Sequence, residues 1–304
     1  MKMINRIYAL SLVVLLGACS KKDNVGMVAY QAEIDKWHAE RIADLKSDNG
    51  WLNLAGLYWL QEGINTFGSS EANHVVFPAG SMAEEAGYFL VKNGTVRMEA
   101  KPEIAITVND QPVRSVEIFH PDSSRSVQVA HGSLRWFVIK RDDQVGIRLR
   151  DLSSEAMQKF TGIERYPVDV AWRLEAEFKP TPGKTIDITN VLGQTVAQDS
   201  PGVLSFEHEG SKYSIDALDG GKDELFLIFG DSTNQDETYP SGRYLYVKRP
   251  DPSGKVIIDF NKSYNPPCAF TPYATCPLPP RQNLLSTYVR AGEKNYHGYA
   301  HASH

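Results

Sequence analysis

The chain has little cysteine, no excess of basic residues and no long hydrophobic run. Of its 304 residues, 32 are Lys or Arg, 37 are Asp or Glu and 3 are Cys, which gives a net charge of −5. An acidic chain lacks the cationic surface that binds phosphate backbones, so we expect no nucleic-acid partner. The Gly-x-Ser-x-Gly, His-Glu-x-x-His, P-loop and dinucleotide-binding motifs are also absent, so no familiar hydrolase or nucleotide-binding signature assigns a reaction.

The N-terminus has the pattern of a secretion signal. Lys2 and Arg6 precede an apolar run over residues 7–16. This run is shorter than the roughly 20 residues that a membrane-spanning helix needs. We therefore predict a signal peptide at residues 1–18; the alternative is a buried N-terminal helix with a chance cysteine.

The end of the apolar run, Leu16-Gly17-Ala18-Cys19, resembles the bacterial lipobox. The resemblance implies that Cys19 is lipidated, that residues 19–26 form a tether, and that the membrane is a partner through this anchor. Ser20 stands where Asp is the usual inner-membrane retention signal. The resemblance therefore points to an outer-membrane lipoprotein that faces the periplasm.

The segment after the tether, residues 27–50, is predicted to be an amphipathic helix. Its apolar residues recur at spacings of three to five and Asn49-Gly50 forms a stop signal; they are Tyr30, Ile34, Trp37, Ile42 and Leu45. Such a helix can pack on the protein body or lie on a bilayer. Its polar face is acidic, unlike the Lys- and Arg-rich faces of interfacial helices, so we favour packing.

Beyond the helix the pattern changes to short β-branched or aromatic segments separated by Gly, Asp, Asn or Pro. These predict strands at residues 103–108, 113–118, 134–139, 171–178, 185–191, 203–206, 213–217 and 224–229. The expected fold class is mainly β, with an antiparallel barrel or sandwich-like body. We place it in a single domain, residues 51–293, with hairpin turns at Asp142-Asp143 and Glu209-Gly210 and one short helix at 153–160.

The last residues, 294–304, have no apolar periodicity, and we predict a flexible tail that contains His297, His301 and His304. Residues 51–60 form an aromatic run that fits either a core strand or the wall of a ligand site. Core packing is the more common role of such runs.

The most unusual stretch is residues 265–280, which read NPPCAFTPYATCPLPP and which we call the Pro-Cys segment. Proline neither donates to a strand ladder nor extends a helix, so this segment is irregular and stiff. It is either a structural cover over one end of the β body or a binding rim that presents Phe270 and Tyr273. In an oxidising compartment Cys268 and Cys276 are expected to form a disulfide, because no further ligands complete a metal set.

Upstream of the Pro-Cys segment, polar residues stand at the ends of predicted strands. Such positions ring the mouth of a β structure. The candidate ligand-binding residues are Asp231, Tyr239, Arg243, Asp259, Asn261, Tyr264, Tyr273 and Asn283. The alternative is that the two aspartates only form turns and that Arg243 pairs with one of them.

Several of these motifs resemble a widespread prokaryotic family known only as a domain of unknown function. The resemblance extends over residues 51–293 and is carried by Phe229-Gly230-Asp231, Gly242-Arg243-Tyr244-Leu245, Asp259-Phe260-Asn261 and the Pro-Cys segment. It implies no established reaction, cofactor or catalytic residue.

Three functional hypotheses follow. The favoured one is a lipid-anchored module whose β mouth binds a small molecule. The second is a hydrolase-like enzyme in which Asp231 and Asp259 act as acid and base and Arg243 stabilises negative charge. The third is an envelope scaffold without a ligand. The sequence identifies neither a catalytic residue nor a cofactor, and we expect no metal site.

Overall fold

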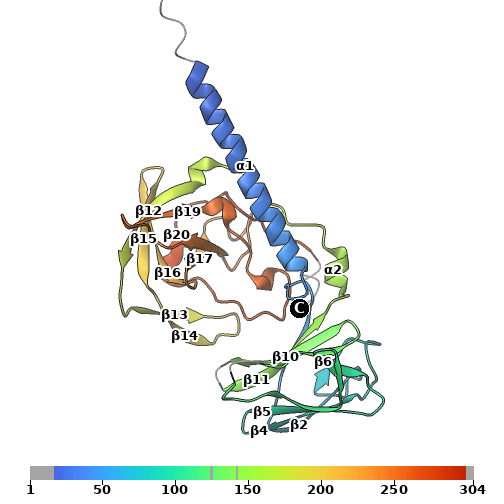
Figure 1. Ribbon diagram of the computed structural model, residues 1–304. Helices are drawn as coiled ribbons and strands as arrows, with labels where there is room; N and C mark the ends of the chain where they lie inside the picture. Colours follow the sequence, from blue (N-terminus) through green and yellow to red (C-terminus); the bar gives the residue numbers. More distant parts are fainter. Residues whose placement is uncertain (1–16, 124–125, 142, 299–304) are drawn as a thin grey trace, which may run out of the picture.

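The computed structural model describes residues 17–123, 126–141 and 143–298, with side chains from residue 26 onward. The predicted signal peptide, the Cys19 side chain, Asp142 of the predicted hairpin turn, and His301 and His304 therefore lie outside the described residues. One long helix and four largely antiparallel sheets make up the described chain (Figure 1). The prediction of a mainly β fold with an N-terminal helix is confirmed.

Helix α1 spans Gly17–Lys46, so it contains the predicted tether and the predicted helix up to residue 46. It lies along the C-terminal part of the molecule, and its N-terminal end extends past the body (Figure 1). Ile34 and Leu45 are buried to 1% and 0% exposure, which confirms that the helix packs on the protein. No helix in the described ranges is both long and apolar enough to span a membrane.

Two sheets pack face to face to form an N-terminal sandwich. Their orders are β1-β11-β10-β9-β6-β7 and β3-β2-β4-β5-β8. The strands are β1 (Leu54–Trp59), β2 (Gly63–Gly68), β3 (Val75–Val76), β4 (Gly87–Lys92), β5 (Thr95–Ala100), β6 (Ile106–Val108), β7 (Gln111–Val113), β8 (Ser115–Phe119), β9 (Val129–His131), β10 (Leu134–Arg141) and β11 (Gln144–Asp151). Phe67, Phe89, Trp136 and Ile147 lie at the centre of the shared core.

The C-terminal half forms a nearly closed barrel with the strand order β18-β17-β16-β15-β12-β19, in which β18 also contacts β19. Its strands are β12 (Arg173–Pro180), β15 (Gly202–His208), β16 (Ser211–Asp219), β17 (Glu224–Asp231), β18 (Arg243–Lys248), β19 (Lys255–Asp259) and β20 (Leu284–Leu285), which pairs with β17; the separate hairpin is β13 (Thr185–Thr189) and β14 (Thr195–Asp199). The short helices are α2 (Glu155–Lys159), η1 (Val170–Trp172), η2 (Phe260–Lys262), η3 (Pro267–Ala269) and η4 (Arg281–Asn283).

Local signals placed several elements correctly. Glu209 and Gly210 both have positive φ, at 50° and 75°, as a two-residue hairpin turn between β15 and β16 requires. Ser154 caps α2 through a hydrogen bond from the main-chain nitrogen of Met157. Both agree with the turn and the short helix expected from the sequence.

Buried hydrophobic side chains form one large cluster in the sandwich and another in the barrel. The assignment of residues 51–293 to a single domain stays a prediction. Lys294 to Tyr296, which we placed in the flexible tail, are instead anchored. Tyr296 is 8% exposed and packs with Phe270, and the main-chain nitrogen of Asn295 donates to the carbonyl of Glu237.

The Pro-Cys segment crosses between the barrel and the sandwich. The predicted disulfide between Cys268 and Cys276 is confirmed. The Tyr244 hydroxyl donates to the carbonyl of Pro277 at 2.7 Å, and the main-chain nitrogen of Leu278 donates to Thr189 at 2.8 Å. The segment is therefore a fixed strap, and its role as cover or rim depends on what it lines.

Candidate functional site

The polar residues that the sequence placed at strand ends do stand there. Asp231 ends β17, Arg243 begins β18 and Asp259 ends β19. Asp231 and Arg243 form an ion pair with Arg243 Nη2 2.8 Å from Asp231 Oδ2, and both side chains are 0% exposed. Both side chains are therefore inside the protein, and neither lines the cavity described below.

The Asp231–Arg243 pair fastens the end of the chain to the barrel. Arg243 also donates to the main-chain carbonyls of Val289, at 2.7 Å, and of Ala291. Asp231 Oδ1 accepts from the main-chain nitrogen of Val289 at 3.2 Å. Because each charge has a counter-charge and further hydrogen bonds, the pair braces the fold.

Asp259 and Asn261 hold helix α1 on the barrel. The Tyr30 hydroxyl donates to Asp259 Oδ1 at 2.8 Å, and Asn261 Nδ2 donates to Tyr30 Oη at 2.9 Å. Burial and the bond to the Asp259 carboxylate raise the pKa of Tyr30. Asp231 and Asp259 thus have separate sets of partners, and the structure does not arrange them as an acid–base pair beside Arg243.

The four remaining candidate residues have different surroundings. Asn283 is buried, and its side-chain amide forms hydrogen bonds with main-chain groups of β16 and β17. Tyr239 packs against the small hydrophobic cluster around Phe270, and Tyr273 is half-buried in the Pro-Cys segment. Of these four, Tyr264 alone lines the cavity described next.

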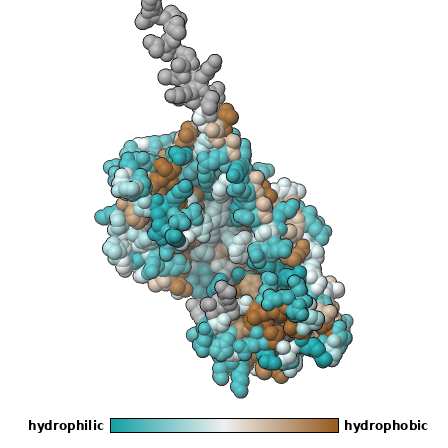
Figure 2. Space-filling view, viewed as in Figure 1, coloured by the Kyte–Doolittle hydropathy of each residue, from teal (hydrophilic) through white to brown (hydrophobic). Residues whose placement is uncertain are grey.

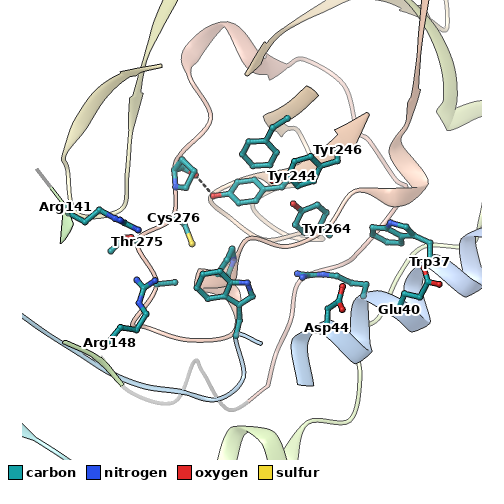
Figure 3. Close-up of a pocket in the computed structure, with 16 residues that line it drawn as sticks. Trp37, Glu40, Asp44, Arg141, Arg148, Tyr244, Tyr246, Tyr264, Thr275 and Cys276 are labelled. Atoms are coloured by element: carbon teal, nitrogen blue, oxygen red, sulfur yellow. Dashed lines mark hydrogen bonds between the residues drawn. The ribbon is translucent and has the colours of Figure 1, made fainter. Parts of the chain in front are cut away.

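That cavity lies where α1, the sandwich and the Pro-Cys segment meet, and its volume is about 520 Å³ (Figure 3). Sites for small molecules usually measure about 300–1,000 Å³. Its lining comes from distant parts of the chain: Trp37, Glu40, Arg41, Asp44, Trp51, Arg141, Arg148, Phe226, Tyr244, Tyr246, Tyr264, Pro267, Ala274, Thr275, Cys276 and Pro277. The Pro-Cys segment is therefore part of a rim, although Phe270, which we expected it to present, is buried.

Aromatic rings form most of the apolar wall. Tyr246 and Tyr264 are nearly parallel, with ring centroids 6.4 Å apart, and Tyr244 meets Tyr264 edge-on at 5.9 Å. The hydrogen bond from Tyr244 to Pro277 fixes that ring against the strap (Figure 3). A fixed aromatic wall binds planar or apolar groups with little loss of side-chain entropy.

Arg41 of α1 reaches the cavity with its charge already balanced. Its Nη2 donates to the carbonyl of Asn265 at 3.0 Å, and its Nε lies 3.4 Å from Glu293 Oε1. Glu293 is 0% exposed, and burial raises the pKa of its carboxyl group. The Arg41 guanidinium also stacks over the Tyr264 ring at 4.6 Å, so Arg41 fastens α1 to the barrel.

Arg148 provides a cationic wall from the sandwich. In β11, Val145, Ile147 and Leu149 face the sandwich core, so Arg148 and Arg150 lie on the opposite face of the sheet. That face is covered, since Arg148 is only 6% exposed and its guanidinium lies 5.9 Å from the Trp51 ring. The covered outer face of β11 is thus a wall of the cavity.

The charge of Arg148 is not matched by any protein group in the described ranges. Its Nε and Nη2 are buried and form no hydrogen bond with a described residue. Burial and the neighbouring cations Arg141 and Arg150 lower the pKa of Arg148 to about 10, so the side chain is a cation at neutral pH. Buried charges are normally paired and hydrogen-bonded. Because Arg148 lines the cavity, an anion bound there would supply the missing counter-charge.

Arg150, two residues further along the same face, has protein partners. Its Nη1 donates to Asn53 Oδ1 at 2.6 Å and to the carbonyl of Gly50. It is as deeply buried as Arg148, at 6% exposure. The two arginines thus differ in hydrogen bonding while sharing strand, face and burial.

Sequence reasoning missed this cationic wall. The alternation of Val145, Ile147 and Leu149 with Gly146, Arg148 and Arg150 was a signal for a strand, but it indicates a polar face open to solvent. Coverage of that face depends on packing against residues that are distant in the sequence, such as Trp51. Within the described chain, no group of three or more His, Cys, Asp or Glu residues is placed to hold a metal ion.

Part of the chain is similar to a family of unknown function. Residues 158–294 match the model described as "Protein of unknown function (DUF1684)". The match covers the barrel and the Pro-Cys segment, so it agrees with the C-terminal part of the resemblance noted above. No curated protein matches the chain.

Among solved structures, an uncharacterized protein of Haloarcula marismortui, determined by NMR, is 28% identical; the match covers 44% of this chain and 77% of that one, with a TM-score of 0.38. Two structures of FHA domains are each 14% identical and match 31% of this chain, with a TM-score of 0.22. The matches cover 92% and 97% of those chains.

The contrast between Arg148 and Arg150 predicts opposite effects on stability. Arg148→Met removes a buried cation without a protein partner, so the free energy of unfolding should rise by about 1 kcal/mol or more. Arg150→Met leaves the oxygens of Gly50 and Asn53 without this donor, so the free energy of unfolding should fall by about 1–3 kcal/mol. Urea unfolding monitored by tryptophan fluorescence measures both changes. A loss of stability in Arg148→Met as large as in Arg150→Met would contradict this assignment.

Proposed function

We propose that this protein binds a small molecule that carries an anionic group and an apolar or aromatic body, in the cavity between α1, the sandwich and the Pro-Cys segment. The observation that carries the proposal is the buried Arg148 guanidinium, which lines the cavity and has no bonding partner among the described residues. An arginine presents its donors in a planar fork that matches a carboxylate or phosphate group.

The surroundings of Arg148 support an anion over any other occupant. Arg141 lines the same cavity, so two cations lie close together. The low dielectric of a buried site strengthens an ionic interaction there. The stacked and edge-on tyrosines next to them then suit the body of the ligand.

Buried polar residues of the barrel hold the helix that forms one wall of the cavity. Arg41 packs on Tyr264 and pairs with Glu293, while Tyr30 bonds Asp259, so α1 is held as one wall. Binding is the function that this arrangement favours. The partners of Asp231 and Asp259 give no comparable support to acid–base catalysis.

The binding proposal is tested with p-toluate, an aromatic carboxylate, followed by ligand-observed NMR and thermal unfolding. We expect p-toluate to bind and to raise the unfolding temperature. Arg148→Met should weaken binding by roughly tenfold to hundredfold, because a charged hydrogen bond contributes about 1.5–3 kcal/mol.

The matched control is Arg135→Met, which removes the same charge from neighbouring strand β10 without touching the lining of this cavity. This variant should bind p-toluate like the wild type. Equal affinity in the wild type and Arg148→Met, or no binding to either, would refute an anion site at Arg148 and leave the scaffold hypothesis.

We also propose that Cys19 is lipidated and holds the protein at the outer membrane, facing the periplasm. The support is the lipobox-like sequence that ends at Cys19 and the signal-peptide pattern before it. Helix α1 extends its N-terminal end away from the barrel, which suits an anchor at that end (Figure 1).

Lipidation is tested by growing cells that express the protein in tritiated palmitate. The wild type and a Cys276→Ser control should incorporate label. Cys19→Ala should not, because the Cys19 thiol is the proposed lipid acceptor. Label that persists in Cys19→Ala, or that is absent from the wild type, would contradict the anchor.

A further inference from the structure

Two carboxylates line the cavity at the end away from Arg148. Glu40 and Asp44 stand one turn apart on α1. Figure 3 shows Glu40 and Trp37 on the opposite side of the tyrosines from Arg141 and Arg148, with Asp44 below Tyr264. Both residues are exposed. The cavity therefore has a cationic end on the sandwich and an acidic end on the helix.

Apart from Arg41, which already has a counter-charge, the lining of the cavity carries equal numbers of positive and negative side chains. The lining contains three arginines and two acidic residues. Arg41 is already matched by the buried Glu293, 3.4 Å away. The remaining charges are two cations, Arg141 and Arg148, and two carboxylates, Glu40 and Asp44.

The acidic end has little compensation from the protein. Glu40 meets Lys36 at 3.8 Å, but both side chains are more than half exposed, so the interaction is weak. No ion pair of Asp44 occurs with a residue that the structure describes. Like charges four residues apart destabilise a helix, so a cation placed between them would relieve that repulsion.

From this arrangement we infer that the ligand is a zwitterion, with its anionic group on Arg148 and a positively charged amine between Glu40, Asp44 and the aromatic rings. The inference rests on the proposed binding function and names its ligand class. The buried Arg148 fixes one end of the molecule independently of the acidic residues, so the acidic pair determines only the second end.

The aromatic rings also favour a bound amine at the acidic end of the cavity. Trp37 comes from the same helix as Glu40 and Asp44, and its ring lies 6.4 Å from Tyr264. Faces of Trp and Tyr attract ammonium groups within about 6 Å. The same wall thus accommodates the apolar body and contacts the amine, so a ligand with both charges gains contacts that a simple anion does not make.

The test compares three probes built on one ring. p-(Aminomethyl)benzoate carries both charges, p-toluate only the anion and benzylamine only the cation. Ligand-observed NMR titration of the full-length protein measures the affinity of each. We expect p-(aminomethyl)benzoate to bind about three- to tenfold more tightly than p-toluate, and benzylamine to bind most weakly.

Variants then separate the two ends. Glu40→Gln combined with Asp44→Asn should reduce the affinity for p-(aminomethyl)benzoate to that for p-toluate, without weakening p-toluate. Glu71→Gln combined with Glu103→Gln changes the net charge equally at exposed positions outside the cavity lining, and should preserve the preference. Arg148→Met should weaken both carboxylate probes.

The outcomes distinguish this inference from the proposed function. If p-toluate and p-(aminomethyl)benzoate bind equally and both depend on Arg148, the anion site stands and the zwitterion inference fails. If the preference persists in the double variant on α1, the acidic pair is not the amine site and the inference also fails. If none of the probes binds, both the inference and the proposed function fail.

Discussion

A buried cation without a counter-charge from the described protein is the constraint on which the rest of this structure depends. Arg148 lies on the outer face of β11, which an isolated sandwich would expose to water, and it becomes buried because Trp51 and neighbouring parts of the molecule cover that face. Folding therefore leaves a charged group at the wall of a cavity in a place where burial is unfavourable. An anion bound there would neutralise the charge of Arg148. The packing between sandwich and barrel would then depend on whether the ligand is bound.

The other walls of the cavity are held rigidly. Arg41 fixes α1 through Glu293 and the Tyr264 ring, and Tyr30 adds a second attachment at Asp259. The disulfide and the bond from Tyr244 to Pro277 fix the strap. On the face shown in Figure 2 the surface of both bodies is largely hydrophilic with smaller hydrophobic areas, which agrees with binding inside a cavity better than with a broad apolar interface.

Local patterns in the sequence predicted much of the fold and little of the site. Helical periodicity, strand composition, the Glu209-Gly210 turn and the cysteine spacing all depend on neighbouring residues, and each agrees with the structure. Asp231, Arg243 and Asp259 were also placed correctly at strand ends. The pairing of Arg243 with one of the aspartates was one of the predicted alternatives, and it agrees with the structure. The contacts of the aspartates with Val289 and Tyr30 were not predictable, because these residues approach only in the folded chain. Arg148 was missed for the same reason, since burial of a polar strand face is a property of tertiary packing.

The most direct measurement is a crystal structure of the protein grown with p-toluate. If Arg148 is an anion-binding group, the carboxylate of the probe will lie within hydrogen-bonding distance of the Arg148 guanidinium, with its ring against the tyrosine wall. A structure in which protein groups form hydrogen bonds with the Arg148 guanidinium and the probe is absent from the cavity would contradict the assignment.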